Sequence, residues 1–296
     1  MKKIAFIGLG NMGIQMAGNL IEANVELKVY DIVNQAMDIL EKKGATKASS
    51  IKEAVKDVDY VITMLPSGKE VRDVYLGDEG IIENAGSNTL LIDSSTIDVQ
   101  TSRMVFDTAQ KAGKEMIDAP VSGGIAGAKS GTLTFMVGGN EDAFKKAKEI
   151  LQILGKKIIY TGSSGCGQAA KICNNMILGI TMIGVSEAFA LAKSLKLDSK
   201  KLFDVASNAS GQCWSLTSYC PEPGLLDNTP SNNNFKAGFT TKMMLKDLRL
   251  SQETAQEFGV ATPLGAEATA LYTLFNNSGN AEVDFSGIIK MIKGIN

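Results

Sequence analysis

The chain has 296 residues, with 30 lysines and arginines against 32 aspartates and glutamates, and a formal net charge of -2. This near-neutral balance argues against nucleic acid or an anionic membrane surface as the main partner. Hydrophobic residues make up 44% and charged residues 21%, which is ordinary for a soluble globular protein of two domains. Because the chain has no histidine and its four cysteines form no CxxC pair, we expect no metal site, reduced thiols and a cytoplasmic location.

Strand-like and helix-like patterns alternate in the first half of the chain. Short apolar runs predict strands at 4–7, 27–30, 60–65, 89–92, 115–118, 132–137 and 157–160. Helical patterns cover 12–23 and 99–112. Such alternation is typical of βαβ units in a parallel, doubly wound sheet.

Helical periodicity replaces the strand signals beyond residue 162. We predict a helix of almost thirty residues from 168 to 195, then helices at 199–206, 241–257, 263–275 and 285–292. The most apolar stretch, 176–192, is interrupted by Glu187 and falls short of the ~20 apolar residues of a membrane span. We interpret it as a buried helix that supports a homodimer or homotetramer, because its apolar residues run most of the way around it.

These patterns predict an α/β fold with a domain boundary near residue 163. The first domain, 1–163, would hold the doubly wound sheet, and the second, 164–296, would be all-helical and joined to it by the long helix. One segment, 220–235, contains three of the six prolines and three consecutive asparagines. It is either disordered or an ordered loop near the mouth of an active site.

A glycine-rich turn follows the first strand and opens the first helix. Its residues are Gly8, Leu9, Gly10, Asn11, Met12 and Gly13. A strand, GxGxxG and a helix in this order predict a Rossmann-type dinucleotide-binding domain. Gly8 would permit the tight turn, Gly10 would let the backbone approach a pyrophosphate, and Gly13 would let helix and strand pack closely. The helix N-terminus would offer free N–H groups to the phosphates.

Asp31 ends the second strand, eighteen residues after Gly13. A carboxylate there accepts hydrogen bonds from the adenosine ribose and repels a 2′-phosphate. The next three residues supply no arginine that could hold that phosphate. The sequence therefore favours NAD over NADP as the cofactor.

Two turns at strand ends are expected to line the nicotinamide half of the cofactor, because ligands bind beyond the carboxyl ends of parallel strands. One is Met64, Leu65 and Pro66, and the other is the turn that ends at Thr96. We count Glu70 with them as a cofactor-binding residue. Pro66 would also stop its strand, and Thr96 has an alternative role as the N-cap of the next helix.

Hydride transfer to or from an alcohol carbon needs a group that handles the hydroxyl proton. With histidine absent, Lys171 is the candidate, and its spacing places it on one helix face with Asn174 and Asn175. Its neighbours are apolar, and burial would lower the pKa of the ammonium toward the working range. On spacing alone, a solvated surface lysine remains the alternative.

Several blocks in the same order resemble the β-hydroxyacid dehydrogenase family almost from end to end. They are residues 6–13, 93–97, 118–124, 131–139, 165–175 and 246–248. The resemblance implies that Lys171 is the general acid/base and that Asn175 orients the substrate. It also implies that the substrate carboxylate is held by Ser122, Gly123 and Gly124.

The same resemblance assigns four residues of the second domain. Lys246 would reach the cofactor and substrate, and Asp247 would steady it. Trp214 and Phe239 would form an apolar wall for the substrate. Ordinary structural roles stay open for two of them, since Trp214 would also suit core packing and Asp247 a local ion pair.

The implied activity is NAD-dependent oxidation of 3-hydroxyisobutyrate to methylmalonate semialdehyde, a step of valine catabolism, on a small anionic hydroxyacid. Sister enzymes remain alternatives: tartronate semialdehyde reductase, succinic semialdehyde reductase and L-serine dehydrogenase. A non-catalytic dinucleotide-binding module is a further alternative, although such a relative is expected to lose the lysine. The chain departs from the family pattern at residues 23–25, Cys220 and 231–235, and the last two of these departures bear on the choice of substrate.

Overall fold

The structure is a computed structural model that describes residues 1–294. It divides into two compact units, residues 1–171 and residues 172 onward. This division falls within a long helix, α9 (Cys166–Ser194), whereas the boundary predicted at residue 163 precedes it. The last two residues of the predicted second domain, Ile295 and Asn296, lie outside the described residues.

A nine-stranded sheet forms the centre of the first unit. Its strands are β1 (Lys3–Ile7), β2 (Glu26–Tyr30), β3 (Thr46–Lys47), β4 (Tyr60–Thr63), β5 (Leu90–Asp93), β6 (Glu115–Asp118), β7 (Val121–Ser122), β8 (Leu133–Gly139) and β9 (Gly155–Gly162). The first six pair in parallel in the order β3-β2-β1-β4-β5-β6. β8 joins β6 in antiparallel fashion and also pairs with β7 and β9. The predicted doubly wound sheet is confirmed.

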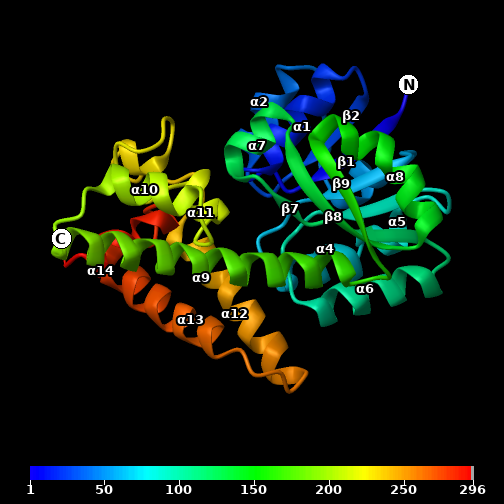
Figure 1. Cartoon of the computed structure of the whole chain (residues 1–296). Coiled ribbons are helices and arrows are strands. Elements are labelled where there is room, and N and C mark those ends of the chain that lie inside the picture. Colours follow the sequence, from blue (N-terminus) through cyan, green and yellow to red (C-terminus); the bar gives the residue numbers. More distant parts are fainter. Residues whose placement is uncertain (295–296) are drawn as a thin grey trace. The chain divides into compact units, whose positions relative to one another are not determined.

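Helices cover both faces of this sheet (Figure 1). They are α1 (Gly13–Glu22), α2 (Asn34–Glu41), α3 (Ile51–Val55), α4 (Gly68–Leu76), α5 (Ile81–Asn84), α6 (Val99–Lys111), α7 (Gly124–Ser130) and α8 (Glu141–Leu154). Successive strand residues point to opposite faces, so Ile4 and Phe6 enter one core while Ala5 and Ile7 enter the other. Helices α1, α2, α7 and α8 close the first core, and α3 to α6 close the second.

The second unit is helical, as predicted. Besides the rest of α9, it contains α10 (Ser199–Ser207), α11 (Trp214–Thr217), η1 (Pro230–Asn232), α12 (Thr241–Glu257), α13 (Pro263–Phe275), η2 (Asn276–Asn280), η3 (Phe285–Gly287) and α14 (Ile288–Ile292). Helices α12 and α13 lie side by side (Figure 1). Gly179 of α9 lets Leu248 of α12 approach closely, since a Cβ at Gly179 would lie 3.0 Å from a Leu248 methyl group.

Helix α9 is long and apolar enough to cross a membrane by length and composition, a criterion that the core helix of a soluble protein also meets. Of its most apolar eighteen-residue window, 44% is buried. Ile177 and Leu191, both in this helix, are more than half exposed. The stretch interpreted as a buried helix is therefore half-buried, because one face packs on the core of its unit and the other faces outward.

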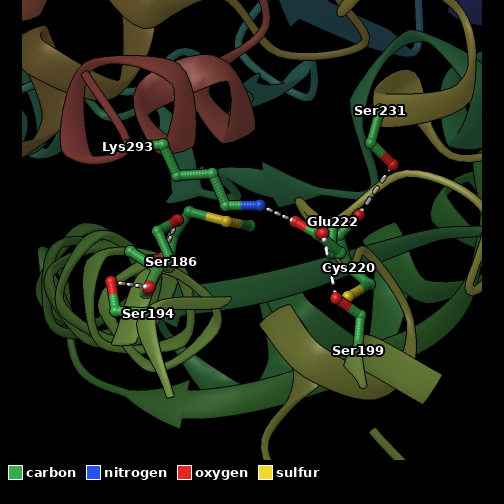
Figure 2. A network of polar contacts seen from close by, with 9 residues as sticks. Ser186, Ser194, Ser199, Cys220, Glu222, Ser231 and Lys293 are labelled. Carbon is green, nitrogen blue, oxygen red and sulfur yellow. Dashed lines mark hydrogen bonds and ion pairs between the residues drawn. The ribbon is translucent and has the colours of Figure 1, made fainter. Parts of the chain in front are cut away.

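The proline-rich segment 220–235 is an ordered loop rather than a disordered one. Figure 2 shows Lys293 pointing at Glu222, with which it forms an ion pair, while the Ser199 hydroxyl donates to Glu222 at 3.1 Å. The Ser231 hydroxyl donates to the carbonyl of Cys220 at 2.8 Å. These contacts fasten the loop to α10 and to the end of α14.

Asp118, at the end of β6, holds the start of α9. Its side chain is buried, and its two carboxylate oxygens accept hydrogen bonds from the backbone N–H groups of Gly165 at 2.8 Å and Gln168 at 2.9 Å. These are N–H groups at a helix N-terminus, which lack partners within the helix. Burial raises the pKa of Asp118 to about 6, against the opposing effect of the two backbone hydrogen bonds.

Gln168 makes a second connection from the same helical turn. It is fully buried; its side-chain amide donates to the carbonyl of Ser95 at 2.7 Å and accepts from the backbone N–H of Ile97 at 3.1 Å. The first turn of α9 is thus fixed to the loops that follow β5 and β6. This fixes the rotation of the helix and hence the direction of the residues on its next turn.

The raised pKa of Asp118 predicts a pH-dependent stability. Since the pKa in the folded state exceeds the unfolded value, the folded state binds the proton more tightly, and stability from this group is lost as pH rises from about 4 to about 6. We expect the free energy of unfolding of the wild type, relative to Asp118→Asn, to fall by about 2 kcal/mol over this range. Urea unfolding at a series of pH values measures it. A difference that stays constant with pH would contradict the prediction.

Candidate active site

The glycine-rich turn after β1 has two positions where a side chain cannot fit. Gly8 has a φ of +93°, and a Cβ there would lie 2.4 Å from the carbonyl oxygen of Met64. A Cβ at Gly13 would lie 2.0 Å from the carbonyl oxygen of Gly8. Gly10 differs, because it is exposed and a Cβ there would meet no atom of the described residues within 4 Å. Two glycines therefore serve the packing of the turn, and the third keeps its outer side open.

The N-terminus of α1 has the properties of an anion site. In the described structure no side chain caps this helix, and its first turn contains no acidic residue. The N–H groups of Ile14 and Gln15 donate to the carbonyls of Gly10 and Met12. The N–H of Gly13, the first residue of the helix, and the positive end of the helix dipole are available to phosphate oxygens. Of the other predicted loop residues, Asn11 is exposed, Met12 is half-buried and Leu9 is buried. The donors and the open Gly10 fit a dinucleotide pyrophosphate.

Asp31 lies beside this turn, at the end of β2. Its carboxylate accepts hydrogen bonds from the backbone N–H groups of Leu9 at 2.5 Å and Val33 at 2.7 Å. The side chain thus supports the glycine-rich turn, a role that its sequence position did not reveal. Each carboxylate oxygen has a second lone pair, so the group can still accept a hydrogen bond from a ribose hydroxyl.

The turns after β4 and β5 are connected through Asp93. This buried carboxylate accepts hydrogen bonds from the hydroxyls of Thr63 at 2.7 Å and Ser95 at 2.6 Å. The Ser95 hydroxyl in turn accepts from the backbone N–H of Leu65 at 2.8 Å. Burial raises the pKa of Asp93, and the hydrogen bonds from Ser95 and Thr63 oppose this. The two loops that were expected to line the nicotinamide are therefore held together.

The remaining cofactor candidates lie on or near these turns. Met64 is half-buried and Pro66 is exposed. Glu70, in the first turn of α4, accepts a hydrogen bond from the Ser67 hydroxyl at 2.5 Å, which lowers its pKa. Thr96 is half-buried, and its alternative role as a helix cap is wrong. The N-cap of α6 is Asp98, whose side chain accepts from the backbone N–H of Thr101 at 2.7 Å.

Ser122, Gly123 and Gly124 connect β7 to α7. Gly123 is the N-cap of that helix, with a φ of +136°, and Gly124 follows with a φ of +61°. L-residues rarely adopt either conformation, so the sequence needs two glycines here. Gly123 is exposed, and its two neighbours are half-buried. The backbone is therefore accessible at the point where the resemblance expects the substrate carboxylate.

Lys171 occupies the second turn of α9. The turn before it contains Gln168 and is fixed by the hydrogen bonds that Asp118 accepts. The residue is only 6% exposed, which is rare for a lysine and agrees with its expected burial. It is the last residue of the first unit, and Asn175 follows one turn later on the same helix. The spacing of four residues places the two on one helix face.

Asn175 is buried and held by Asp247 of α12. The Asn175 amide donates to Asp247 Oδ2 at 2.5 Å, and the Asn174 amide donates to Asn175 Oδ1 at 3.0 Å. The other oxygen of Asp247 lies 3.7 Å from the ammonium nitrogen of Lys246. Asp247 is therefore within ion-pair distance of Lys246, as expected. It also positions Asn175, a contact that could not be predicted because the two residues are 72 positions apart in the sequence.

Trp214 and Phe239 belong to one aromatic cluster. Trp214 is 52% exposed and stacks on Tyr219, with ring centroids 5.0 Å apart. Tyr219 stacks in turn on Phe285 at 5.4 Å, and Phe239 meets the edge of Phe285 at 5.7 Å. Core packing does not account for so exposed a tryptophan. Tyr219 and Phe285 carried no pattern in the sequence that pointed to this role.

Two family models match consecutive parts of the chain. One, described as the NAD binding domain of 6-phosphogluconate dehydrogenase, matches residues 3–162. The other, described as NAD-binding of NADP-dependent 3-hydroxyisobutyrate dehydrogenase, matches residues 165–292. The matched parts coincide with the sheet domain and with the helices that follow it.

Similar proteins extend over nearly the whole chain. An NAD-dependent L-serine dehydrogenase of Pseudomonas aeruginosa is 44% identical over 98% of both chains. The mitochondrial 3-hydroxyisobutyrate dehydrogenase of Mus musculus is 42% identical over 98% of this chain and 87% of that protein. A solved structure of Mycobacterium tuberculosis 3-hydroxyisobutyrate dehydrogenase with L-serine is 43% identical, covers 99% of both chains and has a TM-score of 0.95. The chain therefore belongs to the β-hydroxyacid dehydrogenase family and is an NAD(P)-dependent oxidoreductase.

Proposed function

We propose that the protein oxidises 3-hydroxyisobutyrate to methylmalonate semialdehyde, as in valine catabolism, with NAD rather than NADP as the acceptor. The observation that carries the substrate assignment is the half-exposed Trp214, backed by Tyr219. Its free aromatic surface suits an apolar contact with the 2-methyl group of this acid. The cofactor preference rests on Asp31 and on the absence of a basic residue in the three positions after it.

L-serine is the second candidate, and a specific observation supports it. The Pseudomonas aeruginosa relative is named for this substrate, and the Mycobacterium tuberculosis structure contains it. Both acids carry a carboxylate and a primary alcohol, and they differ at C2, which bears a methyl group in one and an ammonium in the other. An ammonium needs an acceptor, and the Asp247 Oδ2 already accepts from Asn175. The Asp247 Oδ1 accepts no hydrogen bond among the described residues, but it faces the Lys246 ammonium at 3.7 Å, and this like charge disfavours a second ammonium there. This favours the methyl-bearing acid.

The proposed reaction assigns one task to each group of residues. The Gly8–Gly13 turn and the N-terminus of α1 bind the pyrophosphate, and Ser122 to Gly124 bind the substrate carboxylate. Asn175, held by Asp247, orients the substrate. Lys171, in its neutral form, accepts the hydroxyl proton as the alcohol is oxidised and returns it in the reverse direction. Bound NAD supplies the hydride acceptor.

Removal of the Lys171 amine should abolish turnover while cofactor binding persists. For Lys171→Met we expect kcat to fall by about 10³-fold, the usual size of a lost general base, with an unchanged Kd for NADH. Stopped-flow rates and NADH fluorescence titration measure the two quantities. Lys193→Ala, which removes an exposed lysine near the end of the same helix, is the control and should retain wild-type kcat. Near-normal turnover of Lys171→Met would refute the assignment.

The open side of Gly10 should be required for the cofactor and dispensable for folding. Gly10→Ala adds a Cβ into free space, so we expect stability within about 0.5 kcal/mol of the wild type. The Kd for NADH should rise at least about tenfold, because the backbone approaches the pyrophosphate there. Gly18→Ala, in α1, also places its Cβ in free space and should leave the Kd unchanged. Equal NADH affinity of both variants would argue against this phosphate site.

A panel of acids tests the substrate. The acids are (S)-3-hydroxyisobutyrate, L-serine, D-glycerate and 4-hydroxybutyrate, each assayed with NAD and with NADP by initial-rate NAD(P)H formation. We expect 3-hydroxyisobutyrate with NAD to exceed the others in kcat/KM by about tenfold or more, since one methyl contact is worth about that much. A higher value for L-serine would move the protein to the sister activity. Absence of any rate despite NADH binding would support a non-catalytic role.

A further inference from the structure

Asp284 lies at the centre of the hydrogen bonds that hold the aromatic cluster. It is fully buried, and its Oδ2 accepts from the Tyr219 hydroxyl at 2.9 Å and from the backbone N–H groups of Gly238 at 2.9 Å and Phe239 at 3.1 Å. Its Oδ1 accepts from the backbone N–H of Ser286 at 3.0 Å and from the Ser286 hydroxyl at 2.6 Å. One carboxylate thus joins three separate segments of the second unit.

The backbone on either side of Asp284 holds the same segment. The Asp284 N–H donates to the carbonyl of Phe235 at 2.9 Å, and the Phe285 N–H donates to the carbonyl of Phe239 at 3.0 Å. Phe235 has a φ of +54°, an unfavourable conformation for a bulky residue. Such a conformation persists where the surroundings impose it. The path of the chain from Phe235 to Phe239 is therefore determined by the residues around Asp284.

Tyr219 connects Asp284 to the exposed tryptophan. Its ring lies between Trp214 and Phe285, and its hydroxyl is fixed by Asp284. Burial and the neighbouring Asp284 raise the pKa of Tyr219, so the hydroxyl stays protonated and able to donate. A hydrogen bond to a carboxylate is stronger than one between neutral groups. The position of the Trp214 ring therefore depends on the Asp284 carboxylate, to which Trp214 is connected through Tyr219.

We propose that Asp284 is a positioning residue for substrate selection. Through Tyr219 and the Gly238–Phe239 backbone it fixes the rings of Trp214 and Phe239 as a rigid wall for the C2 substituent of the acid. The inference rests on the proposed function, which assigns these two rings to the substrate wall. A rigid aromatic surface loses little conformational freedom on binding, so loosening it weakens substrate binding.

The test uses a pair of matched tyrosine variants. Tyr219→Phe keeps the ring in its stack and removes its hydrogen bond to Asp284. Tyr272→Phe is the control, because Tyr272 is fully buried and its hydroxyl donates to the carbonyl of Phe285 at 3.1 Å. The control loses a hydrogen bond to the backbone of Phe285 and leaves the hydrogen bond from Tyr219 to Asp284 in place. Trp214 is the single tryptophan of the chain, so its fluorescence reports on the wall alone.

For Tyr219→Phe we expect KM for the preferred acid to rise about three- to tenfold, with kcat and the Kd for NADH nearly unchanged. This pattern is expected because the wall contacts the acid equally in the ground state and in the transition state. Acrylamide should quench Trp214 more readily than in the wild type. Asp284→Asn should change both quantities in the same direction. Tyr272→Phe should lower stability and leave both quantities at their wild-type values.

Two results would overturn the inference. One is unchanged Trp214 quenching in Tyr219→Phe, and the other is an equal rise of KM in both tyrosine variants. If Asp284→Asn does not fold, the tyrosine pair still decides. If the wild type oxidises none of the acids, the proposed function fails, but Trp214 quenching in the free protein still shows whether Asp284 and Tyr219 position the ring.

Discussion

The buried Asp118 carboxylate is the constraint on which the geometry of the first unit's site depends. It accepts hydrogen bonds from two backbone N–H groups at the start of α9, and the Gln168 side chain fixes the same turn to the loop after β5. A helix rotates by about 100° per residue, so a start displaced by one residue would turn Lys171 away from its present direction. A charged group is costly to bury, as the raised pKa of Asp118 shows. The benefit is a fixed position for the one lysine that the proposed chemistry needs.

The second unit uses buried carboxylates in the same way. Asp247 fixes the Asn175 amide, and Asp284 fixes two backbone N–H groups and the Tyr219 hydroxyl. In each case the acid does not take the role of an acid in the proposed reaction. It is the acceptor that holds a neighbouring donor in one direction, because leaving that buried donor unpaired would cost about twice what an ordinary hydrogen bond contributes. A buried carboxylate therefore positions candidate residues in each unit.

Much of the fold follows from local pattern. Alternating residues in short apolar runs specify strands with two buried faces, and the helices at 241–257 and 263–275 have the predicted bounds. Helices α3, α5 and α7 were missed because four to seven residues contain too few turns for a periodic signal. The longer helices α2, α4 and α8 were not predicted either, and for α8, with fourteen residues, length is not the reason. The apolar character of α9 was predicted correctly, but the prediction that it is buried was wrong, because composition does not say which sides of a helix are covered.

The sequence by itself determined the dinucleotide motif and the shared helix face of Lys171 and Asn175, because these depend on residues that are adjacent or one helical turn apart. The family and the candidates Ser122–Gly124 followed from the resemblance of whole blocks along the chain. The tertiary structure alone decided which distant side chains hold them. Asp118 meets Gln168 across 50 residues, Asp247 meets Asn175 across 72, and Asp284 meets Tyr219 across 65. No periodicity or spacing encodes such pairs. They arise because folding buries polar groups together, and a buried donor must find an acceptor wherever the chain supplies one.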